Sequence, residues 1–143
     1  VKFNLPKVTN INGAYNFDNC GTSSNKALIV LPKVVELGFR TFRDGYFSAV
    51  DIGPDLGSNG IRADTFFNGR YDIVILRKSS VVTASNANAI KQLTTANGTT
   101  IFVPQALLAS YPAAQYWSSE TRTYAAIEGS IYENNYADGT PIT

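Results

Sequence analysis

The chain has 143 residues, of which 44% are hydrophobic and 16% charged, and its formal net charge is +1. This length and composition favour one globular domain and exclude a disordered chain. The low net charge gives no general attraction to nucleic acid or to anionic membranes, and no apolar stretch approaches the roughly 20 residues that span a bilayer. We therefore expect neither nucleic-acid binding nor membrane insertion.

Short apolar segments rich in Val and Ile recur along the chain, bounded by Gly, Pro or Ser, and they predict strands of roughly 4–6 residues. Each contains an apolar pair, and these pairs recur at intervals of 26, 21 and 24 residues. In chain order the pairs are Phe3-x-Leu5, Ile29-x-Leu31, Val50-x-Ile52 and Val74-x-Leu76. The dipeptides Asp44-Gly45 and Asn68-Gly69 are typical of turns and directly precede two of these segments.

The clearest internal repeat has a period of 24 residues, at which segment 41–52 aligns with segment 65–76 without a gap. Phe17, Phe42 and Phe66 follow nearly the same rhythm. A unit of this length cannot bury its own hydrophobic face, whereas stacked neighbours can. The repeat therefore predicts stacked coils with one parallel strand per coil and aromatic side chains stacked inside. The alternative is a β-sandwich with accidental internal similarity.

The segment after the repeats predicts a cap. Thr100–Val103 is expected to form one more strand, and Pro104 lies where a helix would begin. The apolar residues that follow, ending at Tyr111, would seal the open end of the stack. Pro112 is expected to shorten or kink this helix, and Trp117 is expected to lie in the core of the cap.

Specific motifs support this reading. In the repeats they are Lys7-Val8-Thr9-Asn10-Ile11, Phe17-Asp18-Asn19-Cys20 and Ala27-Leu28-Ile29-Val30-Leu31-Pro32, and in the closing segment Ile101-Phe102-Val103-Pro104 and Tyr111-x-x-Ala114-x-x-Trp117-Ser118. Over about residues 1–133 the chain resembles the BspA-like leucine-rich repeat family. The resemblance implies an α/β fold: a short leucine-rich-repeat solenoid (1–99), a small C-terminal helical cap (100–133) and a polar tail (134–143). It also implies that Cys20 is a structural thiol.

The residue types argue against catalysis. The chain has no histidine and one cysteine, which excludes Ser-His-Asp and Cys-His arrangements and His-based metal sites. The Gly-rich run 53–60 lacks the lysine of a phosphate-binding loop and is expected to be a surface loop. A pair of turn aspartates could serve a carbohydrate-acting enzyme, which stays a remote alternative. We expect no enzyme activity, no cofactor and no metal.

Strand alternation places a mostly aliphatic set of side chains on the outer face of the sheet, opposite the core. The set is Leu28, Val30, Ala49, Asp51, Ile73 and Ile75. A solvated face is normally polar, so we expect a neighbouring subunit or another partner to cover this one. Two alternatives remain: scattered surface aliphatics are ordinary, and a register error of one residue would exchange the faces.

Arginine and aromatic residues in the turns are candidate contact points, because such side chains concentrate binding energy when exposed. They are Arg40, Arg43, Tyr46, Arg62, Arg70 and Tyr71, although Phe47 and Tyr71 occupy equivalent repeat positions and one of them could be core.

The resemblance implies a non-catalytic module of a bacteriophage virion appendage, a tail or head fibre. Its expected partners are its own copies in a trimer, other virion subunits, and a host-surface receptor or glycan. The alternative is an adhesin segment of a bacterial cell-surface protein. Because the chain opens at Val1 in mid-repeat, we expect it to be part of a longer or processed product.

Overall fold

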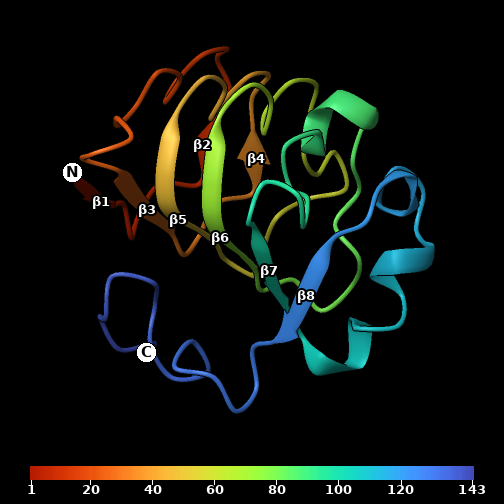
Figure 1. The fold of residues 1–143 in the computed structure, drawn as a ribbon. Helices are drawn as coiled ribbons and strands as arrows, with labels where there is room; N and C mark the ends of the chain where they lie inside the picture. The colour runs from red at the N-terminus through yellow and green to blue at the C-terminus, as the bar shows by residue number, and fades with distance from the viewer.

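Six parallel strands form the main sheet of the computed structural model, which describes residues 1–143. In spatial order they are β1 (Lys2–Asn4), β3 (Ala27–Leu31), β5 (Tyr46–Ile52), β6 (Arg70–Leu76), β7 (Thr100–Val103) and β8 (Thr123–Ala126) (Figure 1). Helix is confined to four short 3-10 segments, η1 (Ala87–Ile90), η2 (Gln105–Leu107), η3 (Tyr111–Ala113) and η4 (Trp117–Ser119). The chain is therefore α/β with a mostly parallel sheet and little helix, which confirms the predicted parallel sheet.

The register between strands reproduces the spacing of the apolar pairs. Phe3 pairs with Ile29, Ile29 with Val50, and Val50 with Val74. These partners are 26, 21 and 24 residues apart, the intervals at which the apolar pairs recur in the sequence. Units that follow one another in the sequence are thus neighbours in the sheet.

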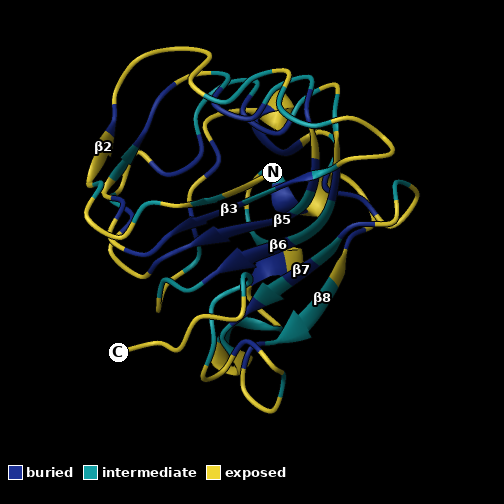
Figure 2. Ribbon diagram, turned by 90° about the vertical axis from the view of Figure 1, so that its left-hand side faces the viewer, coloured by how far each residue is buried: buried dark blue, intermediate teal, exposed yellow.

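A second, shorter set of parallel pairings lies away from the main sheet (Figure 2). β2 (Asn10–Ile11) pairs with β4 (Glu36–Leu37), and Ile61 forms a parallel bridge with Ala84. Side chains from these pairings and from the main sheet belong to one hydrophobic cluster of 25 buried residues. The second set therefore closes the core on the side opposite the outer face of the sheet.

Aromatic rings stack inside this core as the repeat predicts. The Phe42 and Phe66 ring centroids are 5.4 Å apart, and those of Phe47 and Tyr71 are 5.8 Å apart. Such pairs contribute about 0.5–1.5 kcal/mol beyond the burial of their area. The Tyr71 hydroxyl donates to the Phe42 carbonyl at 2.6 Å, and burial raises the pKa of Tyr71. The prediction that Tyr71 is a contact point is wrong, because its side chain is part of the core.

The turns repeat as closely as the strands. The backbone is left-handed at equivalent positions of successive units: Tyr15, Arg40 and Asp64 in one column, and Asn19, Asp44 and Asn68 in another. Their φ angles lie between 55° and 63°. Amides of these turns donate to carbonyls of the next unit, as Arg40 N does to Ala63 O at 3.0 Å and Asp44 N to Phe67 O at 3.0 Å. Each turn conformation is therefore held by its neighbour.

Gly38 lies where two turns approach too closely for a side chain. A Cβ atom there would lie 1.7 Å from the Gly13 carbonyl oxygen. We expect Gly38→Ala to lower the free energy of unfolding by about 3 kcal/mol, because the backbone would have to shift. The matched control is Gly13→Ala, whose Cβ would lie 3.5 Å from the Asn16 side chain and should change stability by less than about 1 kcal/mol. Urea denaturation measures both, and equal midpoints would contradict the close approach.

The segment 53–60 is not simply a surface loop. Its exposed residues include Pro54, Asp55 and Asn59, but Leu56 is buried in the main core. The backbone at Gly53 and Gly60 is also packed, since a Cβ at either position would lie 2.0 Å from a carbonyl oxygen. The prediction missed this packing because a single leucine among turn residues carries no periodic signal.

The closing segment differs from the predicted helical cap. Pro104 precedes η2 as expected, but only separate 3-10 turns follow, and no α-helix forms. Pro112 explains part of this, since proline lacks an amide proton and disfavours helix in the residue before it. The segment also contributes β8, a strand that the sequence did not predict. Trp117 is buried as expected, and its indole N–H donates to the Val82 carbonyl at 2.8 Å.

Arg122 holds the closing segment together. Its side chain is 1% exposed, and the guanidinium lies against the face of the Trp117 ring. It donates to the carbonyls of Trp117 at 3.0 Å, Ile90 at 2.9 Å and Leu93 at 2.6 Å. Burial lowers the pKa of Arg122, while the nearby Tyr124 and Glu120 act in the opposite direction. One side chain thus satisfies backbone carbonyls of η1, of the loop after it and of η4.

Candidate functional site

The outer face of the sheet is covered by the chain itself. Residues 127–143 run from β8 back toward the β1 side of the molecule (Figure 1), and Ile127 and Tyr132 form a second hydrophobic cluster with Ile75. The expectation that a separate partner must cover this face is therefore wrong. Of the predicted interface residues, Val30, Asp51 and Ile75 are buried within the chain, whereas Leu28 and Ile73 are half-buried. The end of the predicted cap and the predicted polar tail together take the place of the partner.

A buried ion pair fastens this covering segment. Arg77 donates to both carboxylate oxygens of Asp51, at 2.7 and 3.0 Å, and to the Tyr132 carbonyl at 2.7 Å. The Ala137 amide donates to Asp51 at 2.8 Å. The Arg77 and Asp51 side chains are 9% and 1% exposed. At the far end, Asn4 of β1 donates to Asp138 at 2.7 Å. Burial acts to raise the pKa of Asp138, but hydrogen bonds from Thr140 and from Asn4 outweigh it, so the pKa of this carboxyl is lowered.

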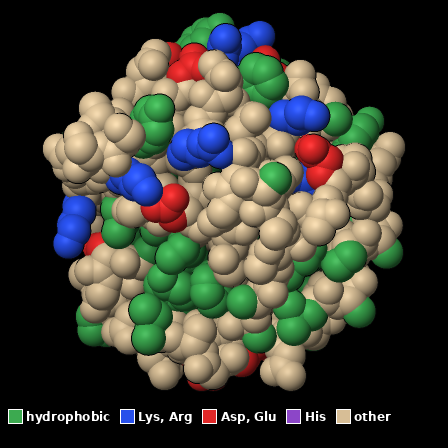
Figure 3. Space-filling model, viewed as in Figure 1, with side chains coloured by type: hydrophobic (Ala, Val, Ile, Leu, Met, Phe, Trp, Pro, Cys, Tyr) green, Lys and Arg blue, Asp and Glu red, His purple; other side chains and the backbone are tan.

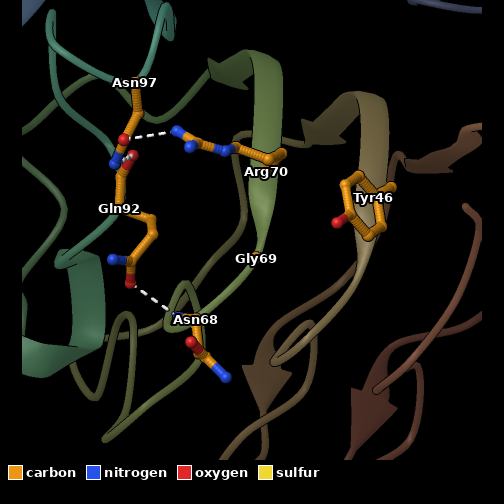
Figure 4. Close-up of a pocket in the computed structure, with 6 residues that line it drawn as sticks. All are labelled: Tyr46, Asn68, Gly69, Arg70, Gln92 and Asn97. Atoms are coloured by element: carbon orange, nitrogen blue, oxygen red, sulfur yellow. Dashed lines mark hydrogen bonds between the residues drawn. The ribbon is translucent and has the colours of Figure 1, made fainter. Parts of the chain in front are cut away.

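A polar hollow of about 170 Å³ lies where β5 and β6 begin (Figure 4). It is lined by Tyr46, Asn68, Gly69, Arg70, Gln92 and Asn97. Tyr46 and Arg70 are the first residues of their strands and are partners in the register, so both project from the same edge. Asn68 and Gly69 come from the turn before β6, and Gln92 and Asn97 from the loop before β7. The repeat thus places residues from three successive units around one space.

Hydrogen bonds hold the rim of this hollow. Arg70 donates to the Asn97 side-chain oxygen, and the Asn68 amide donates to the Gln92 side-chain oxygen at 2.6 Å (Figure 4). The Asn68 side chain in turn donates to Asp44 at 2.6 Å, one unit back. The side chains are therefore positioned before any ligand arrives. Sequence analysis predicted Tyr46 and Arg70 as contact points but missed Gln92 and Asn97, because these lie outside the repeating turn motif.

The other predicted contact arginines are engaged within the chain. Arg40 lies 5.3 Å from the ring centroid of Tyr15 and 3.5 Å from Asp64. Arg43 lies 3.5 Å from Asp44. Arg62 lies 5.2 Å from the Phe39 ring centroid and also pairs with Glu36. In the view of Figure 3, positive and negative side chains are interspersed rather than gathered by sign, and hydrophobic side chains gather mainly below them.

The arrangement offers few groups for chemistry. No group of three or more His, Cys, Asp or Glu side chains lies close enough to hold a metal ion. The Cys20 thiol is half-buried, and burial together with the nearby Asp18 raises its pKa, so the thiol form is favoured over the nucleophilic thiolate. No helix is long and apolar enough to cross a membrane.

Three comparisons with known proteins give no further guide to family or function. No family profile matches the chain. No curated protein and no solved structure matches it significantly.

Proposed function

We propose that the chain is a non-catalytic structural and recognition module of a bacteriophage virion appendage, folded as a short leucine-rich-repeat solenoid. The main support for a solenoid is that residues one unit apart pair in register on both sides of the core. Val50 pairs with Val74 in the main sheet, and Ile11 pairs with Leu37 in the second set. Stacked units that contact mainly their neighbours produce such pairing. Residues 100–133 would then be the cap.

The repeated turns support a role in recognition. Equivalent left-handed positions form columns along the surface, and polar or aromatic side chains occupy them. The bonds between successive turns hold these side chains at fixed spacing, which reduces the ordering cost of binding a ligand. The polar hollow at Tyr46 and Arg70 lies next to these columns, because Asn68 belongs to one of them and also lines the hollow. A preformed polar edge fits a host-surface receptor or glycan better than it fits a substrate that must be enclosed.

The residue types support binding rather than catalysis. The chain has no histidine, the most frequent general base, and the raised pKa of Cys20 favours the unreactive thiol form. Other virion subunits are proposed partners, as is a trimer of this chain. Such a trimer would have to use a surface other than the outer face of the sheet, because residues 127–143 occupy that face. The alternative is an adhesin segment on a bacterial cell surface.

An antiserum raised against the purified chain tests this assignment. Immunogold electron microscopy of the source culture, with and without phage particles, is the measurement. We expect gold on particle appendages, with none on uninfected cells. Labelling of the envelope of uninfected cells would instead favour the adhesin. Labelling confined to the cell interior would contradict both surface roles.

A further inference from the structure

Arg70 differs from every other arginine of the chain in having no carboxylate partner. The other five each lie within 4.0 Å of an acidic side chain: Arg40, Arg43, Arg62, Arg77 and Arg122. Arg70 is exposed and directs its guanidinium to a neutral amide oxygen, that of Asn97 (Figure 4). No carboxylate within ion-pair distance offsets its positive charge, which is therefore available to a ligand.

The hollow offers hydrogen-bond donors and few unused acceptors. The side-chain oxygens of Asn97 and Gln92 already accept bonds from Arg70 and from the Asn68 amide. The remaining guanidinium N–H groups of Arg70, the amide NH₂ of Gln92 and the hydroxyl of Tyr46 have no partner within the chain. A complementary ligand must bring acceptors, and a carboxylate matches the planar guanidinium best.

Tyr46 adds an aromatic ring on the neighbouring strand, on the side of Arg70 away from Asn97 (Figure 4). Tyr46 is 37% exposed and occupies the strand position that pairs with Arg70. An aromatic ring with a polar tip packs well against a ligand that has one apolar and one polar face, as sugar rings do. At about 170 Å³ the hollow is smaller than the roughly 300 Å³ at which drug-sized sites begin, so it suits a single sugar residue.

We propose that this hollow binds the carboxylate of an acidic saccharide of the uronic-acid or sialic-acid type. Arg70 pairs with the carboxylate, Gln92 donates to a neighbouring sugar oxygen, and the Tyr46 ring packs against the sugar. The proposal rests on the proposed recognition function and names its ligand class.

The test is a titration of the isotope-labelled full chain, followed by proton–nitrogen correlation NMR. Trigalacturonate and sialyllactose are the two acidic probes, and methyl-esterified trigalacturonate and lactose are their neutral counterparts. We expect one acidic probe to shift the side-chain N–H signals of Arg70, Gln92 and Asn97, and the neutral counterparts to leave them unchanged. Arg70→Gln should weaken binding about tenfold or more, because it removes a charge-assisted bond. Tyr46→Ala should weaken it several-fold.

Arg62→Gln is the matched control, since it removes the same charge from an arginine that already pairs with Glu36. It should leave affinity within about twofold, because exposed charges at a distance are screened by salt. The proposal is overturned if neither acid shifts these signals, if the neutral sugars bind equally, or if Arg62→Gln weakens binding as much as Arg70→Gln. If Arg70→Gln leaves saccharide affinity unchanged, this site is rejected but the recognition function is not. Failure of particle labelling would reject the virion role but leave the binding result.

Discussion

Asp51→Ala should lower the free energy of unfolding by about 3–5 kcal/mol, the cost of leaving a buried charge without its partner. Asp51 is 1% exposed and accepts two bonds from Arg77 and one from the Ala137 amide. Without Asp51, Arg77 keeps an unpaired charge on the sheet face, and residues 127–143 lose the hydrogen bond from the Ala137 amide. Urea denaturation of wild type and variant gives the difference. Hydrogen exchange at the Ala137 amide should also accelerate, because its acceptor is gone.

Two further variants separate this ion pair from ordinary surface charge. Asp72→Ala breaks the ion pair between Asp72 and Lys26, whose side chains are 43% and 35% exposed, respectively. Because both are solvated, the free energy of unfolding should change by less than about 1 kcal/mol. The double variant Asp51→Leu with Arg77→Met should recover only part of the loss. It removes the unpaired charge, but it leaves the Tyr132 carbonyl and the Ala137 amide without their partners. A loss below about 1 kcal/mol for Asp51→Ala would mean that residues 127–143 do not hold the sheet face in solution.

Arg122→Met should also cost about 3–5 kcal/mol, although it keeps much of the side-chain volume. The change leaves the carbonyls of Trp117, Ile90 and Leu93 without their donor in a buried site. Buried acceptors that lose their partners carry the full cost of desolvation. Thermal unfolding monitored by Trp117 fluorescence is the measurement. The transition of the closing segment should move to lower temperature.

Lys91→Met is the control for Arg122→Met, because Lys91 lies 3.8 Å from Glu120 and its side chain is 47% exposed. It should change stability by less than about 1 kcal/mol. If both variants had the same small effect, apolar packing alone would hold the closing segment. The Arg122 contacts described here would then contribute nothing measurable.

The sequence predicted the sheet because its signal is periodic. Residues such as Val50 and Val74 repeat at the interval that strand pairing requires, and Phe42 and Phe66 repeat with them. A parallel register follows directly from such a repeat. The closing segment has no second copy in the chain to be compared with, so strand β8 and the separate 3-10 turns were not predicted.

The covering segment was missed for a related reason. Its contacts join residues far apart in sequence, as Arg77 does with Tyr132, and no spacing rule connects them. One signal was available: Asp51 is a carboxylate in an otherwise aliphatic face and therefore needs a buried partner. Of the residues that line the hollow, Tyr46 and Arg70 were predicted as contact points because they directly follow the repeated turns. Gln92 and Asn97 come from an irregular loop whose path only the fold defines.

The most direct test of recognition without catalysis is retention of surface polysaccharide by the immobilised full chain. The polysaccharide comes from the bacterium that the labelled particles infect, and its length distribution is measured before binding and after release by salt. We predict reversible retention with an unchanged length distribution. Shortened polysaccharide, or no retention by a chain shown to be folded, would contradict the proposed function.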